Sequence, residues 1–162
     1  MTTHLIIPDA HAHYQYDNIR FDWLGKFILD RKPEVIVCLG DLSDMPSLSQ
    51  HGEGLSFEGR RLKEDVAVTH DALERMWGPF NKYNARRRKN KDKQYRPRKA
   101  IVLGNHEDRI TRYCENTPQL HEWLDISILN YENYFDEITP FRNTLTIDRI
   151  SYSHYFATGV SG

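Results

Sequence analysis

The chain has 162 residues, with 22 Lys or Arg against 23 Asp or Glu and a formal net charge of −1 at pH 7. That length suits one domain with one hydrophobic core, and the balanced charge excludes a whole-chain electrostatic argument for a nucleic-acid or acidic partner. The sequence has no apolar run near the roughly 20 residues of a membrane span and no signal-peptide pattern, so we expect a cytoplasmic protein without a membrane partner.

Three short apolar runs predict strands that are buried on both faces. They cover residues 5–7, 34–39 and 99–103, are rich in β-branched residues, and end in turn signals. Cys38 lies within the second run and is expected to be a core residue. With Cys114 it makes only two cysteines, which fits a reducing compartment.

Helical patterns separate these runs. Ile19, Trp23 and Phe27 step by four and therefore share one face of a first helix. A second, longer amphipathic helix precedes the third run, and Gly78-Pro79 is expected to bend or end it. The apolar stripe of this second helix, which we expect to pack in the core, comprises Leu62, Val66, Thr69, Leu73, Met76 and Phe80.

The alternation of strands and helices predicts an α/β fold with parallel strands and right-handed crossovers. In such sheets ligands gather at the carboxyl ends of the strands. Later in the chain, residues 144–148 and 150–154 alternate apolar and polar side chains, which predicts a hairpin with a tight turn at Asp148-Arg149.

Residues 86–99 carry the one strong charge asymmetry, and we expect them to form a basic loop between a helix and a strand. This loop is either a solvated connection or a mobile arm that draws in a polyanionic substrate. Under the second interpretation the side chains that neutralise nucleic-acid phosphates are Arg86, Arg87, Arg88 and Lys89.

Each predicted strand ends in side chains of the kinds that bind metal ions. The available ligands are Asp9, His11, Asp41, Asn105 and His154. Carboxylate and amide oxygens suit Mn²⁺ and Mg²⁺, and imidazole adds affinity for Mn, Fe, Ni, Co and Zn. A phosphoester hydrolase gains from two such ions about 4 Å apart, and a carboxylate that reaches both fits naturally between them.

Three segments in this order resemble the motifs of the calcineurin-like metallophosphoesterase superfamily. They are Asp9-x-His11, Gly40-Asp41-x-x-Asp44 and Gly104-Asn105-His106-Glu107, and the resemblance extends from Asp9 to His154. It implies a layered α/β fold of mainly parallel strands flanked by helices, with residues 1–162 as one domain. It also implies two divalent metal ions, with Mn²⁺ favoured and Fe, Ni, Zn, Co or Mg as alternatives.

The resemblance further implies a role for each matching residue. Asp9 and His11 would bind the first ion, Asp41 would bridge both ions, and Asn105 with His154 would bind the second. His106 would act near the leaving-group oxygen as a proton donor or electrostatic stabiliser, and Asp44 would orient it.

Substrate choice is less constrained by these motifs. Met45 stands where the Ser/Thr protein phosphatase branch has Arg, so the chain looks more like bacterial or bacteriophage members of the superfamily. We expect hydrolysis of phosphomonoesters or phosphodiesters, with a nucleotide or nucleic acid as the favoured substrate class. Arg109 either pairs with a local carboxylate, a structural role that we favour, or reaches the substrate phosphate, and the role of Glu107 stays open.

The sequence departs from the family at the Gly-His-x-His segment that normally supplies one His to each metal, because no such segment follows His154. Three explanations are open: the chain is the N-terminal part of a longer protein and its fold is incomplete at the C-terminus, which we favour; a second copy or a complementing chain supplies the ligands; or water fills the open positions.

Two rival interpretations remain at this stage. The missing segment fits a catalytically impaired module that acts by binding or assembly, although such a module has no need of His106 and Asp44. Alternatively, the sequence from Asp9 to His13 resembles the first strand end of amidohydrolase-type and polymerase-and-histidinol-phosphatase-type barrels, in which His13 would be a ligand. The barrel gives no reason for the other two motifs.

Overall fold

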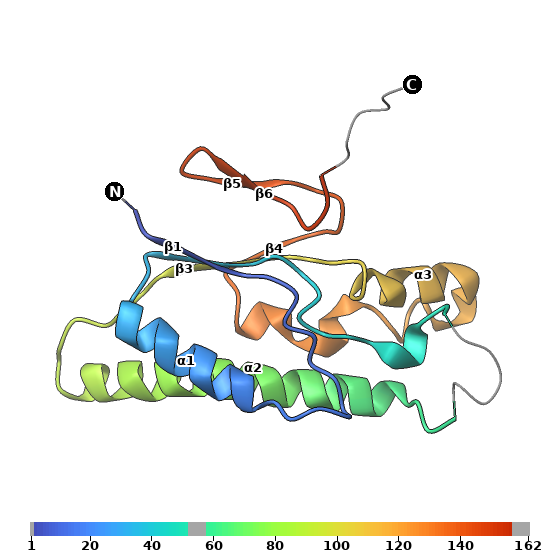
Figure 1. Ribbon diagram of the computed structural model, residues 1–162, viewed down its shortest axis with the longest axis horizontal. Coiled ribbons are helices and arrows are strands. Elements are labelled where there is room, and N and C mark those ends of the chain that lie inside the picture. Colours follow the sequence, from blue (N-terminus) through green and yellow to red (C-terminus); the bar gives the residue numbers. More distant parts are fainter. Residues whose placement is uncertain (1, 52–57, 157–162) are drawn as a thin grey trace.

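The computed structural model describes residues 2–51 and 58–156, and a four-stranded parallel sheet lies at its centre (Figure 1). The strands lie side by side in the order of the chain: β1 (His4–Ile7), β2 (Val35–Cys38), β3 (Arg98–Val102) and β4 (Glu137–Thr139). The predicted α/β class and the first three strands are confirmed. Strand β4 was not predicted, since three residues with one apolar side chain carry no recognisable pattern.

Helices cover one face of this sheet. Helix α1 (Ile19–Arg31) and helix α2 (Leu62–Lys89) pack there, and α3 (Asp108–Asn116) lies beyond the carboxyl ends of the strands (Figure 1). Between them run single 3₁₀ turns that lead from one element to the next: η1 (Pro46–Leu48), η3 (Pro118–Leu120), η4 (Ile126–Leu129) and η5 (Tyr131–Asn133).

The opposite face of the sheet is covered by a hairpin of β5 (Leu145–Ile147) and β6 (Ile150–Tyr152), as Figure 1 shows. The predicted hairpin is therefore confirmed. Both turn residues, Asp148 and Arg149, have positive φ, at 52° and 67°, as the twist of a two-residue hairpin turn requires. The small apolar core beneath the hairpin consists of Val35, Val37, Ala100, Val102, Leu145, Ile147 and Tyr152.

The apolar face of α1 that is most regular in the sequence, that of Ile19, Trp23 and Phe27, is exposed. The exposed fractions are 45% for Ile19, 61% for Trp23 and 43% for Phe27. Helix α1 instead buries the face that carries Gly25, and a Cβ built there would lie 2.5 Å from the carbonyl oxygen of Met76 in α2. Contact through a glycine backbone therefore decides which side of α1 faces the core.

The sequence left open whether α2 bends or ends at Gly78-Pro79; the helix does not end there and runs on to Lys89. A proline inside a helix leaves the carbonyl four residues earlier without its N–H partner. Here that carbonyl belongs to Arg75, and Gly25 of α1 packs against it, so that a Cβ on Gly25 would lie 3.1 Å from the oxygen. The predicted core stripe is confirmed, with Leu73 and Met76 fully buried.

The expected basic loop over residues 86–99 is shorter than predicted. Its first four residues form the last turn of α2, and its last two belong to β3, so that residues 90–97 make the connection. The loop precedes β3 and therefore lies at the amino end of the sheet, at the opposite end from α3 (Figure 1).

Candidate metal centre

The loops that follow β1, β2 and β3 continue the pairing of the sheet beyond the strands. The N–H of His11 donates to the carbonyl of Asp41 at 2.8 Å, and the N–H of Asp44 donates to the carbonyl of Ala12 at 3.1 Å. The first two sequence motifs therefore lie against each other, at the carboxyl edge where parallel α/β sheets hold their ligands.

Several residues of these loops have the left-handed backbone conformation that L-residues rarely adopt. The φ angles are 42° for Asp9, 45° for His11, 47° for Asp41 and 48° for Met45. Each such residue costs about 1–2 kcal/mol, so surrounding contacts have to hold it. Three of the five residues expected to bind metal are thus held in strained positions, which is typical of functional sites.

A close approach of two glycines brings the second and third motifs together. Gly40 has a φ of 84°, and a Cβ on it would lie 2.3 Å from the nitrogen of Gly104. A Cβ on Gly104 would in turn lie 2.0 Å from Oδ1 of Asp41. The same oxygen accepts a hydrogen bond from the N–H of His106 at 2.9 Å, so the Asp41 carboxylate is seated directly on the third motif.

Glu107 links the loops after β2 and β3 through hydrogen bonds to their backbone. Its buried carboxylate accepts the backbone N–H groups of Asp41 at 2.9 Å, Ser43 at 3.0 Å and Gly104 at 2.9 Å. It also accepts the hydroxyl of Tyr131 at 3.0 Å. The role of Glu107, which the sequence left open, is to fix the position of Asp41 relative to the third motif.

The first group of ligand atoms comes from the loops after β1 and β2. One ligand atom each from Asp9, His11 and Asp41 lies within 4.8 Å of the others. The guanidinium of Arg20 in α1 holds the first loop by donating to the carbonyls of Ala10 at 2.9 Å and His11 at 2.5 Å. Two carboxylates and one imidazole form a suitable donor set for Mn²⁺ and similar ions.

A second group gathers around His154, which follows β6. Its Nε2 lies 3.0 Å from Oδ1 of Asn105 and 3.5 Å from Oδ2 of Asp41. Its Nδ1 lies 2.5 Å from the carbonyl oxygen of Leu39, which can only accept a hydrogen bond, so Nδ1 carries the proton. Its Nε2 therefore faces two oxygen atoms, and a cation bound among these three atoms would satisfy them.

Asp41 belongs to both groups, since its carboxylate lies with Asp9 and His11 on one side and with His154 on the other. It is also the most buried of the five predicted ligands, with an exposed fraction of 4%. The structure thus brings together all five residues that the sequence singled out, and the donor set fits two divalent ions that share one carboxylate.

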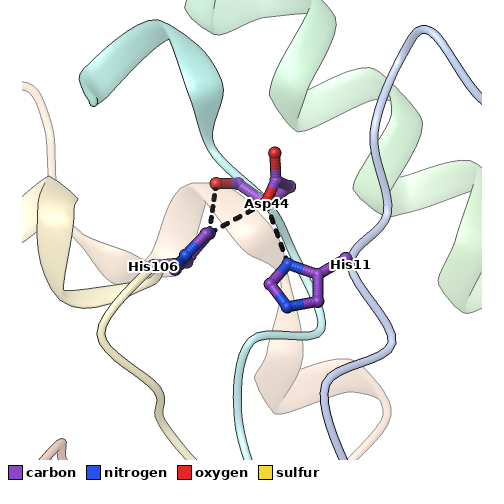
Figure 2. Close-up of side chains that lie close together, drawn as sticks. All are labelled: His11, Asp44 and His106. Atoms are coloured by element: carbon purple, nitrogen blue, oxygen red, sulfur yellow. Dashed lines mark hydrogen bonds and ion pairs between the residues drawn. The ribbon is translucent and has the colours of Figure 1, made fainter. Parts of the chain in front are cut away.

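Asp44 lies between two histidines, as Figure 2 shows. Its Oδ1 is 2.9 Å from Nδ1 of His11 and 2.9 Å from Nδ1 of His106. Burial raises the pKa of Asp44, but the hydrogen bonds from His106 and His11 lower it by more, to about 2. Sequence reasoning paired Asp44 with His106 and missed its contact with His11.

His106 is held by contacts on both ring nitrogens. Its Nδ1 also donates to the backbone carbonyl of Asp44 at 2.7 Å, and its Nε2 lies 3.1 Å from Nη2 of Arg109. Burial and the Arg109 charge lower the pKa of His106. The hydrogen bond to Asp44 and the charge of Asp41 raise it by more, so the pKa lies above its ordinary 6.5.

Arg109 has structural contacts, but they are made to backbone carbonyls and not to the local carboxylate that the sequence favoured: its Nη1 donates to the carbonyl of Asp44 at 2.8 Å. His13 is close to the site as well, with Nε2 3.5 Å from the outer oxygen of Asp44. The barrel that would make His13 a ligand is wrong, because the four parallel strands among the described residues form an open sheet in chain order.

No helix among residues 2–51 and 58–156 is both long and apolar enough to cross a membrane.

One of the comparisons with known proteins gave a match, and it agrees with this geometry. A search of curated proteins gave no match. The family model described as calcineurin-like phosphoesterase matches residues 3–157, which is nearly the whole sequence. The chain therefore belongs to the calcineurin-like phosphoesterase family.

Proposed function

We propose that this chain hydrolyses phosphomonoesters or phosphodiesters through a binuclear metal centre, with a nucleotide or nucleic acid as its substrate class. The family consists of metal-dependent phosphoesterase hydrolases that typically use two divalent ions. The observation that carries the proposal is the position of Asp41, whose carboxylate reaches both groups of ligand atoms.

In this proposal Asp9 and His11 hold one ion, Asn105 and His154 hold the other, and Asp41 bridges them. When bound, two such ions supply a hydroxide nucleophile and neutralise the phosphoryl charge. Mixed carboxylate, amide and imidazole ligands favour Mn²⁺, and Fe, Ni, Zn, Co and Mg suit the same set. The buried, unpaired thiols of Cys38 and Cys114 support a reducing, cytoplasmic location.

His106 serves the leaving group. Its Nδ1–H is fixed on Asp44, which leaves Nε2 as the atom that can carry a second proton. A raised pKa keeps that proton on the ring closer to neutral pH, ready for the departing oxygen. Because Arg109 contacts the same nitrogen, its guanidinium has to turn toward the substrate before Nε2 can donate.

The test is hydrolysis of bis-p-nitrophenyl phosphate in Mn²⁺, with wild type compared with His106→Ala. Because p-nitrophenolate is a good leaving group that needs little protonation, loss of the positioned proton donor should lower kcat by about 10²-fold, the low end of the usual range. His121→Ala is the matched control, because His121 is exposed and directly follows the one-turn helix η3, outside the ligand groups. If wild type showed no turnover that depends on His106, the proposal would fail. Mn²⁺ binding without turnover would then favour the binding or assembly module.

We also propose that nucleic acid binds at the basic end of α2, formed by Arg86, Arg87, Arg88 and Lys89. Arg87 is partly neutralised, because its Nη1 pairs with Asp92 at 3.3 Å. The other three side chains are exposed. This surface lies at the amino end of the sheet, away from the ligand groups, so only a long substrate can touch both.

A further inference from the structure

A cleft of about 210 Å³ opens beside Asn105, one of the proposed metal ligands. Its walls include three arginines, Arg109, Arg112 and Arg142. A second cavity of about 280 Å³ continues outward along α3 and is lined by Arg112 and Arg142 again. These two arginines therefore stand where the cleft leaves the metal centre.

Short chains of contacts connect both arginines to the proposed metal ligands. Nη2 of Arg112 donates to the carbonyl oxygen of Asn105 at 3.0 Å. On the other wall the Phe141 ring lies 6.0 Å from the His154 ring, centroid to centroid, and the Arg142 guanidinium lies 5.4 Å above the Phe141 ring. Arg112 thus contacts Asn105 directly, and Arg142 is linked to His154 through the Phe141 ring.

Among the described residues, arginines outnumber carboxylates in the lining of the two cavities. The carboxylates are Asp108, which lines both cavities and pairs with Arg112 at 3.1 Å, and Glu115, which lines only the second. Arg109 contacts backbone carbonyls and His106, and no carboxylate among the described residues pairs with it. Within the same part of the chain Arg142 has no carboxylate partner either, and its side chain is exposed. The cleft consequently carries excess positive charge.

We propose that Arg112 and Arg142 bind a second phosphate group of the substrate, next to the phosphoryl group that is hydrolysed. The inference rests on the proposed function, because it assumes that the hydrolysed phosphoryl group lies at the proposed metal centre. Guanidinium groups suit this task because their planar array of donors matches the oxygens of a phosphate. The substrate is then a phosphoester with two phosphates, and not a simple phosphomonoester.

Such a substrate is either an oligonucleotide, whose phosphates are separated by a sugar, or a nucleoside polyphosphate. The probes are thymidine 5′-monophosphate, thymidine 3′,5′-bisphosphate and thymidine 5′-diphosphate, with affinity measured by calorimetry in Mn²⁺. Each protein also carries His106→Ala, so that turnover is slow during the titration. Tighter binding of the bisphosphate assigns the cleft to oligonucleotides, and tighter binding of the diphosphate assigns it to polyphosphates.

Arg142→Gln is compared with Arg149→Gln, a matched pair because both arginines are exposed and both have a φ of 67°. One of the two-phosphate ligands should bind about tenfold more tightly than the monophosphate. Arg142→Gln should remove most of this preference, and Arg149→Gln should retain it. Equal affinity for all three ligands, or equal effects of the two substitutions, would overturn the proposal. Absence of bis-p-nitrophenyl phosphate hydrolysis would instead count against the proposed function and leave this comparison intact.

Discussion

Glu107 holds the loops of the candidate site in place through four hydrogen bonds to its carboxylate. One buried carboxylate replaces the hydrogen-bond partners that three backbone N–H groups lose when the strands end. Its fourth partner, Tyr131, belongs to η5, so the carboxylate also links the site to the helical layer. The left-handed Asp41 is held in its strained conformation in part by this contact.

Glu107→Gln should therefore destabilise the protein strongly. The amide NH₂ has to face at least one of the backbone N–H donors, which leaves buried donors unsatisfied at a cost of about 2–3 kcal/mol. Urea denaturation measures the loss. Tyr131→Phe is the control, because it removes a single hydroxyl and should cost about 1 kcal/mol. A Glu107→Gln protein as stable as wild type would show that the carboxylate is dispensable.

Asp65, in the first turn of α2, is a buried carboxylate that has fewer hydrogen-bond partners than Glu107. Its Oδ2 accepts the N–H of Ser47 at 2.9 Å, while Oδ1 is buried and has no hydrogen-bond partner among the described residues. Burial therefore raises the pKa of Asp65 above its ordinary 3.8, despite the hydrogen bonds from Ser47, which lower it. The ionised group destabilises the folded state.

The Asp65→Asn substitution should make stability less dependent on pH. For an acid with a raised pKa, the folded state binds the proton more tightly than the unfolded state. The destabilisation is therefore absent well below pH 3.8, grows between pH 3.8 and the folded pKa, and stays constant above the folded pKa. Asparagine does not ionise, so its advantage in free energy of unfolding should be larger near pH 8 than near pH 3.5. A smaller advantage near pH 8 would contradict this assignment.

At the scale of elements, the sequence predicted the strands and helices that a local pattern of residues indicates. Strands β1 to β3 follow from β-branched runs, and the hairpin follows from alternation around Asp148-Arg149. The continuation of α2 through Pro79 has no local sequence signal, and the carbonyl freed by the proline lies beside Gly25 of another helix. For α1, spacing shows that Ile19, Trp23 and Phe27 share a face, but not whether that face meets a neighbour.

The contact between α1 and α2 can be tested with two glycines. Gly25→Ala places a Cβ 2.5 Å from the Met76 carbonyl, so the helices have to separate and stability should fall by about 1–3 kcal/mol. Gly78→Ala meets nothing within 4 Å beyond its chain neighbours, but its Cβ would face the ring of Pro79, which disfavours the helical conformation of the preceding residue, so the gain in helix propensity should be largely offset. Thermal or urea denaturation of both variants measures the difference. A loss for Gly25→Ala no larger than that for Gly78→Ala would refute the close approach.

At the scale of the whole molecule, the ligand groups and the basic end of α2 lie at opposite ends of the sheet. Helix α2 has 28 residues and begins near the loop that holds Asp44, so its length of about 42 Å separates the two regions. A nucleic acid that contacts both would have to follow the helix. The basic end can therefore raise affinity for long strands without entering the chemistry.

Replacing Arg86, Arg88 and Lys89 by Gln should weaken binding of a long single-stranded DNA. Each lost phosphate contact reduces the slope of log affinity against log salt by about 0.7, so the slope should fall by about 2. The control removes three exposed cations elsewhere, Lys26, Lys63 and Arg149. DNA binding that does not depend on salt, or equal losses in the two triple variants, would contradict a nucleic-acid role for this surface.

The clustering of Asp9, His11, Asp41 and Asn105 could be predicted, because parallel strands bring their carboxyl ends to one edge. His154 follows the antiparallel strand β6, and the family resemblance pointed to it. The residues that hold these loops in place could not be predicted. Arg20 and Glu107 act through backbone groups of loops with positive φ, and no sequence pattern encodes that geometry. Arg142 was also missed, since it lies after the unpredicted β4, and it reaches the cleft through Phe141 and His154.

A Mn²⁺ titration by calorimetry tests the central claim most directly, because it counts the ions that the two ligand groups hold. The account predicts about two Mn²⁺ per wild-type chain and about one per His154→Ala chain, since the group of Asp9, His11 and Asp41 is left in place. His121→Ala should bind as wild type does. One ion or none in wild type, or two ions in His154→Ala, would contradict a binuclear centre built on these residues.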